Sequence, residues 1–250
     1  MISLKNAKEL ALMREACRVS AKALRLVGEA VEPGVTTAEL DRIAEAFILS
    51  CGAKPNFKGY GGFPATACIS INNEVIHGIP SKHRKLCAGD IVSVDLGAVL
   101  NGFHGDNAAT FACGAVSAEA KRLMDVTEAS LYEGIQMARP GGRIGDISAA
   151  VQQYVEARGY SVVRKYVGHG VGTSLHEAPE VPNFGVPGHG VRLVPGMTLA
   201  IEPMVNAGSY GVKVLPDGWT VLTSDGSLSA HFEHTVAITA DGPVIMTTCD

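Results

Sequence analysis

The first fifth of the chain carries apolar residues at the spacing of amphipathic helices. Residues 7–30 repeat apolar side chains every three or four positions, and this pattern stops at Pro33-Gly34. It predicts one long helix there. A second helix is expected directly afterwards, capped by Thr37 and ending at Gly52.

The same arrangement returns in the second half of the chain. Residues 120–138 again have helical spacing and stop at Pro140-Gly141, and a further helix is expected over residues 145–159. The chain therefore contains two similar pairs of predicted helices.

Between these pairs, residues 91–112 form two apolar-rich runs joined by Asn101-Gly102. Asn-Gly is a strong signal for a two-residue hairpin turn, which would oppose residues whose numbers sum to 203. Asp95 and Asp106 sum to 201, so they would be diagonal neighbours on one face of the hairpin, about 7–8 Å apart.

Two carboxylates that point the same way from an apolar hairpin repel each other unless a positive charge lies between them. A metal site would supply that charge. Alternatively, one or both acids are surface residues of a half-exposed strand. The hairpin by itself does not decide between these interpretations.

The two halves of the chain are related by a constant offset. Pro33 and Pro140 are 107 positions apart, and the same shift relates Gly34 to Gly141 and carries Asp95 onto Glu202. We interpret this as an internal duplication within a single domain spanning residues 1–250, with repeats at approximately residues 13–95 and 120–202. It predicts an α/β fold of two helix–helix–strand halves about a pseudo-two-fold axis, with the acids converging on that axis.

Two further segments add candidate ligands. His169 lies between Gly168 and Gly170, whose missing side chains allow close backbone packing, and Glu233 lies in an expected strand over residues 229–238. A lone His or Glu in such a place is usually an ordinary loop or strand residue. Together with the two Asp and Glu202, they give four carboxylates and one imidazole, which suit two ions of Co²⁺, Mn²⁺, Fe²⁺ or Zn²⁺.

Composition limits the broad class. The chain is 46% hydrophobic and 18% charged, with a net charge of −4, which gives no reason to expect nucleic acid or a membrane as partner. Its six cysteines form no CxxC pair, which indicates reduced thiols and a cytoplasmic location. The N-terminal stretch resembles neither a signal peptide nor a transmembrane helix.

Several segments resemble the type I methionine aminopeptidases, members of the pita-bread metallopeptidase family. These segments are NEVIHGIP, SVDLGAVLNGFHGD, GHGVGTSLHEAP, PGMTLAIEPMV, DGWTV and FEHTV, and they are spread over nearly the whole chain. The resemblance implies a pita-bread fold around a curved antiparallel sheet. It also implies removal of the initiator methionine from nascent polypeptides with a small second residue, by attack of metal-activated water on the methionine carbonyl. The N-terminal extension and large insertion expected of type II enzymes are missing.

The resemblance also implies roles for individual residues. The metal ligands would be Asp95, Asp106, His169, Glu202 and Glu233. Asp106 and Glu233 would bridge two ions, and Glu202 would also act as general base. His77 would hydrogen-bond the scissile amide, and His176 would polarise the substrate carbonyl; taken alone, either His would be interpreted as a loop residue.

The implied pocket for the methionine side chain is lined by Tyr60, Phe63, Cys68, His77, His176 and Trp219. Phe63 and Leu175 stand where tyrosyl or aromatic residues are often found in the family, and they are the departures that affect this pocket. Trp219, expected in a strand after Asp217-Gly218, could instead be a core residue. Asn107 and His231 also depart from the usual pattern, where Thr and Gln or Glu are common.

Two alternatives remain at this level. One is an Xaa-Pro peptidase of the same fold, although such enzymes usually carry a large extra N-terminal domain. The other is a non-catalytic pita-bread module that binds peptides, although such modules typically lose metal ligands. The family is usually monomeric, and a transient contact with the ribosome is compatible with a nascent-chain substrate.

Overall fold

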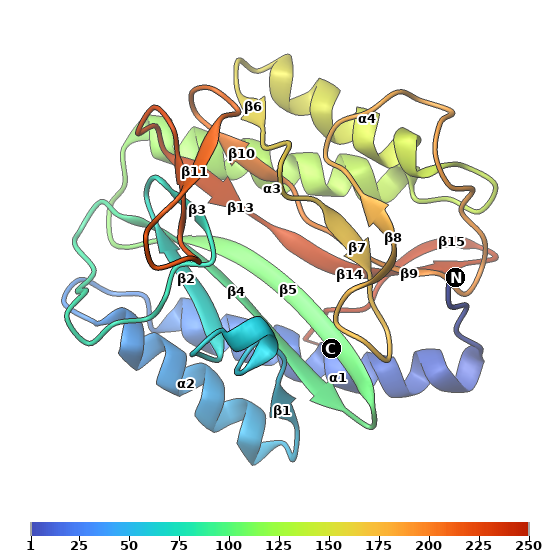
Figure 1. Cartoon of the computed structure of the whole chain (residues 1–250), viewed down its shortest axis with the longest axis horizontal. Coiled ribbons are helices and arrows are strands. Elements are labelled where there is room, and N and C mark those ends of the chain that lie inside the picture. Colours follow the sequence, from blue (N-terminus) through green and yellow to red (C-terminus); the bar gives the residue numbers. More distant parts are fainter. Residues whose placement is uncertain (1, 250) are drawn as a thin grey trace.

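The computed structural model describes residues 2–249, and all four predicted helices are present (Figure 1). Their bounds are α1 Ala7–Glu29, α2 Thr37–Ser50, α3 Ala118–Met137 and α4 Ile144–Glu156. In Figure 1, α1 and α2 run along the lower edge of the molecule and α3 and α4 along the upper edge, with a curved sheet between the two pairs. Among the described residues, none of the helices is both long and apolar enough to cross a membrane.

The residue that caps α2 differs from the prediction. Thr36, rather than Thr37, has the extended backbone of a cap, and its hydroxyl accepts a hydrogen bond from the Glu39 amide. The Glu39 carboxylate accepts from the Thr36 amide in return, which completes a capping box. Thr37 points inward, where its hydroxyl accepts from the amide of Ser81. Either of the two adjacent threonines could have capped the helix, and the reciprocal hydrogen bonds with Glu39 are made by Thr36.

The main sheet has nine antiparallel strands. Seven of them follow the order β1-β4-β5-β14-β9-β7-β8, while β2 also pairs with β4 and β15 with β14. Their bounds are β1 Lys54–Pro55, β2 Ala67–Ile71, β4 Ile91–Leu100, β5 Phe103–Ala112, β7 Gly168–Gly170, β8 Glu177–Val181, β9 Thr198–Ile201, β14 Glu233–Thr239 and β15 Gly242–Ile245.

Two smaller three-stranded sheets complete the described chain, in the orders β13-β10-β6 and β11-β12-β3. Their strands are β3 Glu74–Ile76, β6 Ser161–Val162, β10 Met204–Asn206, β11 Val212–Val214, β12 Val221–Thr223 and β13 Ser229–His231. A short 3-10 helix, η1, covers Tyr60–Gly62. The single strand expected over residues 229–238 is therefore divided, because Phe232 separates β13 from β14.

The hairpin of β4 and β5 has the predicted register. Every opposed pair sums to 203, from Ile91 with Ala112 to Leu100 with Phe103, and Asn101 takes the positive φ that this turn requires. Asp95 is opposite Ala108. Asp106 is opposite Gly97, two positions along, so the two acids are diagonal neighbours as predicted.

Alternation along this hairpin separates a core face from a site face. The even-numbered residues of β4 from Val92 to Ala98 pack in one apolar cluster with residues of α1 and α2, including Leu24 and Ile48. Successive side chains of a strand point to opposite faces, so Asp95 faces away from these helices. Burying the helix-facing row leaves the acids on the opposite face of the same strands.

The second half repeats this construction. β9 and β14, and then β10 and β13, pair with a single register in which opposed residues sum to 435, as in His234 with Ile201 and Met204 with His231. Leu199 and Ile201 pack into the cluster that holds residues of α3 and α4. The fold is the expected α/β pita-bread arrangement of two pseudo-two-fold-related halves around a curved antiparallel sheet.

Backbone contacts also recur at the offset found in the sequence. The amide of Gly34 donates to the carbonyl of Leu86, and that of Gly141 donates to that of Leu193, each at 2.8 Å. Isolated bridges join Thr36 to Lys85 and Arg143 to Arg192. The four residues of the first repeat in these contacts each have their counterpart 107 residues later: Gly34 and Gly141, Thr36 and Arg143, Lys85 and Arg192, Leu86 and Leu193. On these correspondences we propose that residues 13–95 and 120–202 are an internal duplication within one domain.

We expect Gly105→Ala to destabilise the fold, because Gly105 is the point where β5 lies directly against α1. A Cβ atom there would lie 2.5 Å from the Cα of Cys17, which is backbone and cannot rotate away. Overpacking of this kind costs about 1–3 kcal/mol of the free energy of unfolding. Urea denaturation measures it.

The control for Gly105→Ala is Gly211→Ala, whose Cβ would lie 3.3 Å from the rotatable hydroxyl of Ser224. This variant should stay within about 0.5 kcal/mol of the parent protein. Equal stabilities for the two variants would contradict the close packing of α1 on β5.

Candidate metal centre

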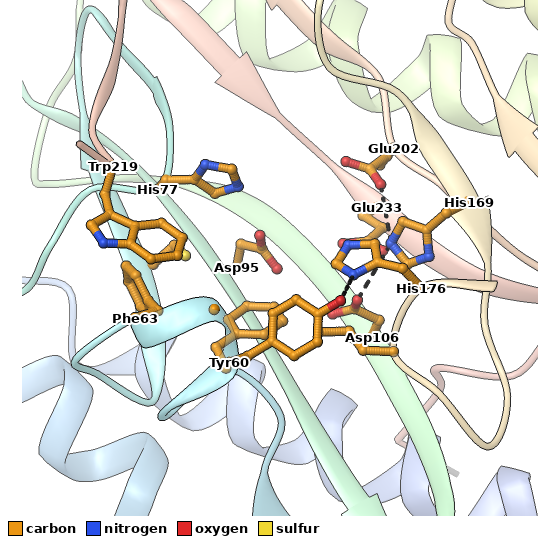
Figure 2. Close-up of a pocket in the computed structure, with 14 residues that line it drawn as sticks. Tyr60, Phe63, His77, Asp95, Asp106, His169, His176, Glu202, Trp219 and Glu233 are labelled. Carbon is orange, nitrogen blue, oxygen red and sulfur yellow. Dashed lines mark hydrogen bonds and ion pairs between the residues drawn. The ribbon is translucent and has the colours of Figure 1, made fainter. Parts of the chain in front are cut away.

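The five acid and histidine residues proposed from the sequence line one cavity together with an apolar wall (Figure 2). The lining consists of Phe57, Tyr60, Gly61, Phe63, Cys68, His77, Asp95, Asp106, His169, Leu175, His176, Glu202, Trp219 and Glu233. Figure 2 shows Phe63 and Trp219 on the left, Asp95 in the centre, and the other three carboxylates with His169 on the right.

His169 reaches this cavity because its strand is inserted tightly between two others. A Cβ atom on Gly168 would lie 2.3 Å from the carbonyl oxygen of Ala200 in β9, and one on Gly170 would lie 2.4 Å from that of Ala178 in β8. Both flanking residues must therefore be glycine for β7 to pair on both sides, as the sequence indicated.

The ring of His169 is oriented by its own strand. Its Nδ1 lies 2.9 Å from the carbonyl oxygen of Gly170, so Nδ1 carries the proton and donates it, leaving the lone pair on Nε2. Nε2 lies 3.5 Å from Glu202 Oε1 and 3.8 Å from Asp106 Oδ2. Asp106, His169 and Glu233 each offer one ligand atom, and these three atoms all lie within 4.8 Å of one another.

The carboxylates are buried without compensation from the protein. Within residues 2–249, Asp95 Oδ1, Asp106 Oδ1 and Glu233 Oε1 are buried and have no hydrogen-bond partner. Burial raises the pKa of Asp106 to about 7. Burial, and then the charge of Asp106, raises the pKa of Asp95 and of Glu233 well above the usual values, and burial with the charges of Asp95 and Asp106 does so for Glu202.

This donor set fits divalent cations. Several buried carboxylates that raise one another's pKa values cannot all be ionised unless positive charge compensates them. Oxygen donors with one imidazole nitrogen are the ligands that divalent transition metals accept. The orphaned oxygens face one cavity, where cations would satisfy them.

His77 and His176 are neutral groups at the edge of this cluster. Burial, with a smaller effect of His176, lowers the pKa of His77 to about 4, and burial also lowers the pKa of His176. His77 has a φ of 61°, a left-handed conformation that is uncommon for a residue with a side chain. The following Gly78 lies so close to β2 that its Cβ would meet the Ile69 carbonyl oxygen at 2.2 Å. The chain therefore holds His77 in an unfavourable conformation at the cavity.

The apolar wall brings together residues that are distant in the sequence. The rings of Phe63 and Trp219 pack edge to face at 5.1 Å, and Cys68 is buried beside them. Burial, followed by the charge of Asp95, raises the pKa of the Cys68 thiol well above its usual value, so it is not a nucleophile at neutral pH. Leu175, also buried, closes the wall.

Trp219 lies in a turn rather than in the strand expected from the sequence. Asp217 Oδ1 accepts hydrogen bonds from the amides of both Trp219 and Thr220, which forms a side-chain-supported turn before β12. The indole lines the cavity and also packs against the apolar cluster of Phe63 and Cys68.

Tyr60 links the wall to the charged side. Its hydroxyl lies 2.7 Å from His176 Nδ1 (Figure 2), although 48% of the residue's surface is exposed. The ring of His176 lies 4.2 Å from that of His169, centre to centre. The sequence indicated that Tyr60 and His176 share a pocket, but the direct contact between them was not foreseen.

The sequence analysis missed two lining residues, Phe57 and Gly61. The signal for both was the aromatic and glycine-rich segment FKGYGGF at residues 57–63. Gly59, Gly61 and Gly62 all have positive φ there, which folds the segment back on itself so that its aromatic rings reach the cavity.

The curved sheet and its buried donor set define a protein that holds divalent metal ions beside an apolar pocket. A model of the metallopeptidase family M24 matches residues 11–240 of the chain. The chain belongs to this family, and the resemblance found in the sequence is confirmed.

Individual relatives give the same result. The methionine aminopeptidase of Clostridium acetobutylicum is 57% identical over 250 residues, covering all of both chains. The crystal structure of methionine aminopeptidase from Thermotoga maritima matches 99% of this chain and all of its own, with 47% identity and a TM-score of 0.98. A prolidase from Pyrococcus furiosus, at 23% identity and a TM-score of 0.80, shares the fold; the match spans 66% of that protein.

The carboxylate cluster predicts how the stability of the metal-free protein depends on pH. The folded protein keeps the Asp106 proton up to a pKa of about 7, whereas the ordinary value is 3.8, so the folded state binds more protons between these values. The free energy of unfolding should therefore fall as pH rises through this window. Urea denaturation of chelator-treated protein at about pH 5 and about pH 7.5 measures the change.

Adding Mn²⁺ should restore stability, and more strongly at the higher pH, because cations replace the protons. Asp106→Asn is the matched variant, in which the decrease should be smaller. A metal-free protein that is equally stable at both pH values would contradict the uncompensated burial of these acids.

Proposed function

We propose that this chain removes the N-terminal methionine from polypeptides whose second residue is small. The observation that carries the proposal is the joining of an apolar, aromatic pocket to a buried carboxylate cluster in one cavity. An unbranched apolar side chain of a substrate can pack against Phe63, Cys68 and Trp219. The backbone of that substrate residue then lies next to the acids. The names of the relatives support the same assignment.

The proposed metal ligands are Asp95, Asp106, His169, Glu202 and Glu233, holding two divalent ions of a kind that these donors do not specify. When bound in such a site, the ions supply Lewis acidity toward water and toward the carbonyl of the scissile bond. Asp106 and Glu233 would be the ligands that the two ions share; each is almost fully buried and has an oxygen without a partner among the described residues.

His176 is proposed to stabilise the substrate's carbonyl oxygen. In this assignment the Tyr60 hydroxyl donates to His176 Nδ1 across 2.7 Å, which leaves the remaining proton on Nε2. Nε2–H can then donate to the oxygen as it gains negative charge in the transition state. The depressed pKa keeps the ring neutral at pH 7, so it acts as a hydrogen-bond donor and not as a cation.

His77 is proposed to contact the scissile amide, from the edge of the cavity between Trp219 and Tyr166. Its ring lies 6.2 Å from the Trp219 ring and 5.8 Å from the Tyr166 ring, both nearly perpendicular. These contacts hold the imidazole next to the pocket that would receive methionine.

Glu202 is proposed to accept the proton of the attacking water. Water adds to the methionine carbonyl carbon, the carbon–nitrogen bond then breaks, and the proton passes to the leaving amine. Glu202 lines the cavity, and its Oε1 lies 3.5 Å from His169 Nε2, which places the carboxylate beside the proposed metal ligands. The products are free methionine and a polypeptide shortened by one residue.

We further propose that the protein is a cytoplasmic monomer whose substrates are nascent chains, with at most a transient contact with the ribosome. The absence of a membrane-crossing helix among residues 2–249 is compatible with that location.

The proposed activity is tested with the peptides Met-Ala-Ser and Met-Ile-Ser and with purified, metal-loaded protein. We expect release of methionine from the first peptide only, because β-branched isoleucine has few rotamers with which to avoid the walls around the scissile bond. Chromatography of free methionine measures the reaction, with chelator-treated protein as control.

An Ala-Pro peptide distinguishes the Xaa-Pro alternative. Cleavage of Ala-Pro with no release of methionine from Met-Ala-Ser would sink the proposal, and binding without any cleavage would point to the non-catalytic alternative.

His77→Ala and His176→Ala separate substrate contact from metal binding. Both variants should keep the metal content of the parent protein while kcat falls by about 10²–10³, the usual cost of losing one transition-state donor. Elemental analysis and steady-state kinetics measure the two quantities. Loss of metal from either variant would assign that histidine to the metal ligands instead.

A further inference from the structure

A buried histidine of the second half, His231, occupies the position that Asp106 occupies in the first half. In the β4–β5 hairpin, Gly97 is opposite Asp106. Shifting Gly97 by 107 gives Met204, and the residue opposite Met204 is His231. The same shift carries Asp95 onto Glu202, so Glu202 and His231 are diagonal neighbours on one face, as Asp95 and Asp106 are.

The backbone of His231 is held firmly while its ring is left without a partner. The Thr110 hydroxyl accepts from the His231 amide at 2.9 Å and donates to its carbonyl at 2.9 Å. The side chain is 1% exposed, and neither ring nitrogen has a hydrogen-bond partner among residues 2–249. Every tautomer of an imidazole has at least one N–H group, and buried donors of this kind are normally satisfied.

The nearest charged group to this ring is the carboxylate of Glu202. Its Oε2 lies 3.8 Å from His231 Nε2, and its Oε1 lies 3.5 Å from Nε2 of His169. The two oxygens of one carboxylate therefore face two different histidines. A small rotation of the Glu202 or His231 side chain would bring Nε2 and Oε2 within hydrogen-bond distance, about 2.7–2.9 Å for a charge-assisted bond.

His231 is placed to act on Glu202 rather than on the substrate or a metal ion. Glu202 lines the cavity, whereas His231 is absent from the described lining. The ring of His231 therefore lies next to Glu202 without lining the cavity.

We propose that His231 is a positioning residue, whose Nε2–H donates to Glu202 Oε2 and fixes the direction in which Oε1 faces the metal centre. The proposal rests on the proposed role of Glu202 as a metal ligand. It also explains why His231 departs from the usual family pattern. The first half contributes a second carboxylate, Asp106, at this position, whereas the second half contributes a hydrogen-bond donor that orients the carboxylate of Glu202. Partners that orient a ligand in this way raise metal affinity by about 10–100-fold.

The test compares His231→Phe, which keeps a ring of similar shape without nitrogen, with His231→Gln, which keeps an N–H donor of similar reach. Co²⁺ is titrated into metal-free full-length protein by calorimetry, and the visible spectrum of the Co²⁺-loaded protein is recorded. We expect His231→Phe to weaken binding of one ion by about 10–100-fold and to change the spectrum, and His231→Gln to restore both.

Kinetics with Met-Ala-Ser add a second measurement. In His231→Phe, kcat should fall by about tenfold or more while KM stays within about twofold, because the substrate pocket is untouched. Thermal melting verifies that each variant is folded, and His231→Leu replaces His231→Phe if the larger ring prevents folding.

Two results would overturn the inference. One is a nitrogen-free variant that binds Co²⁺ with the parent affinity and spectrum. The other is an equal loss in His231→Gln and His231→Phe, which would indicate packing and not hydrogen bonding. The Co²⁺ measurements need no turnover, so a parent protein that releases no methionine would refute the proposed function separately.

Discussion

The site depends on one electrostatic constraint, the burial of four carboxyl groups around the imidazole of His169 in one cavity. Desolvation raises the pKa values of all four carboxyl groups, and repulsion from neighbouring acids adds to the rise for Asp95, Glu202 and Glu233. Such a cluster opposes folding unless protons or cations neutralise it. The surrounding sheet must therefore supply enough packing energy to hold the acids together, which the two apolar clusters beneath it do.

The pseudo-two-fold arrangement explains how the chain assembles this cluster from distant segments. Each half packs one face of a long antiparallel strand pair on its helices and presents the other face to the centre, so Asp95 and Glu202 approach from opposite halves. The halves are not chemically equal, because Asp106 corresponds to His231, and Glu233 corresponds to Ala108. Two of the acids thus belong to β4 and β5, while the other two adjoin or begin β9 and β14.

The parts of this site that follow regular structure could be predicted from the sequence. The Asn101-Gly102 turn fixed a register of ten opposed pairs, and that register placed Asp95 and Asp106 on one face. Glycines around His169 indicated close packing, which the neighbouring carbonyls require. The cap of α2 was misplaced by one residue because Thr36 and Thr37 have the same chemistry, and only the reciprocal contact with Glu39 distinguishes them.

Segments without periodicity could not be predicted in the same way, and they build the wall of the pocket. Phe57 and Tyr60 reach the cavity through a run of positive-φ glycines, and Trp219 through a turn held by Asp217. The hydrophobic periodicities of strands and helices, two and 3.6 residues, do not reveal positions of this kind. Selectivity for a substrate must therefore be sought in these loops, while the register of the strands determines where the acids meet.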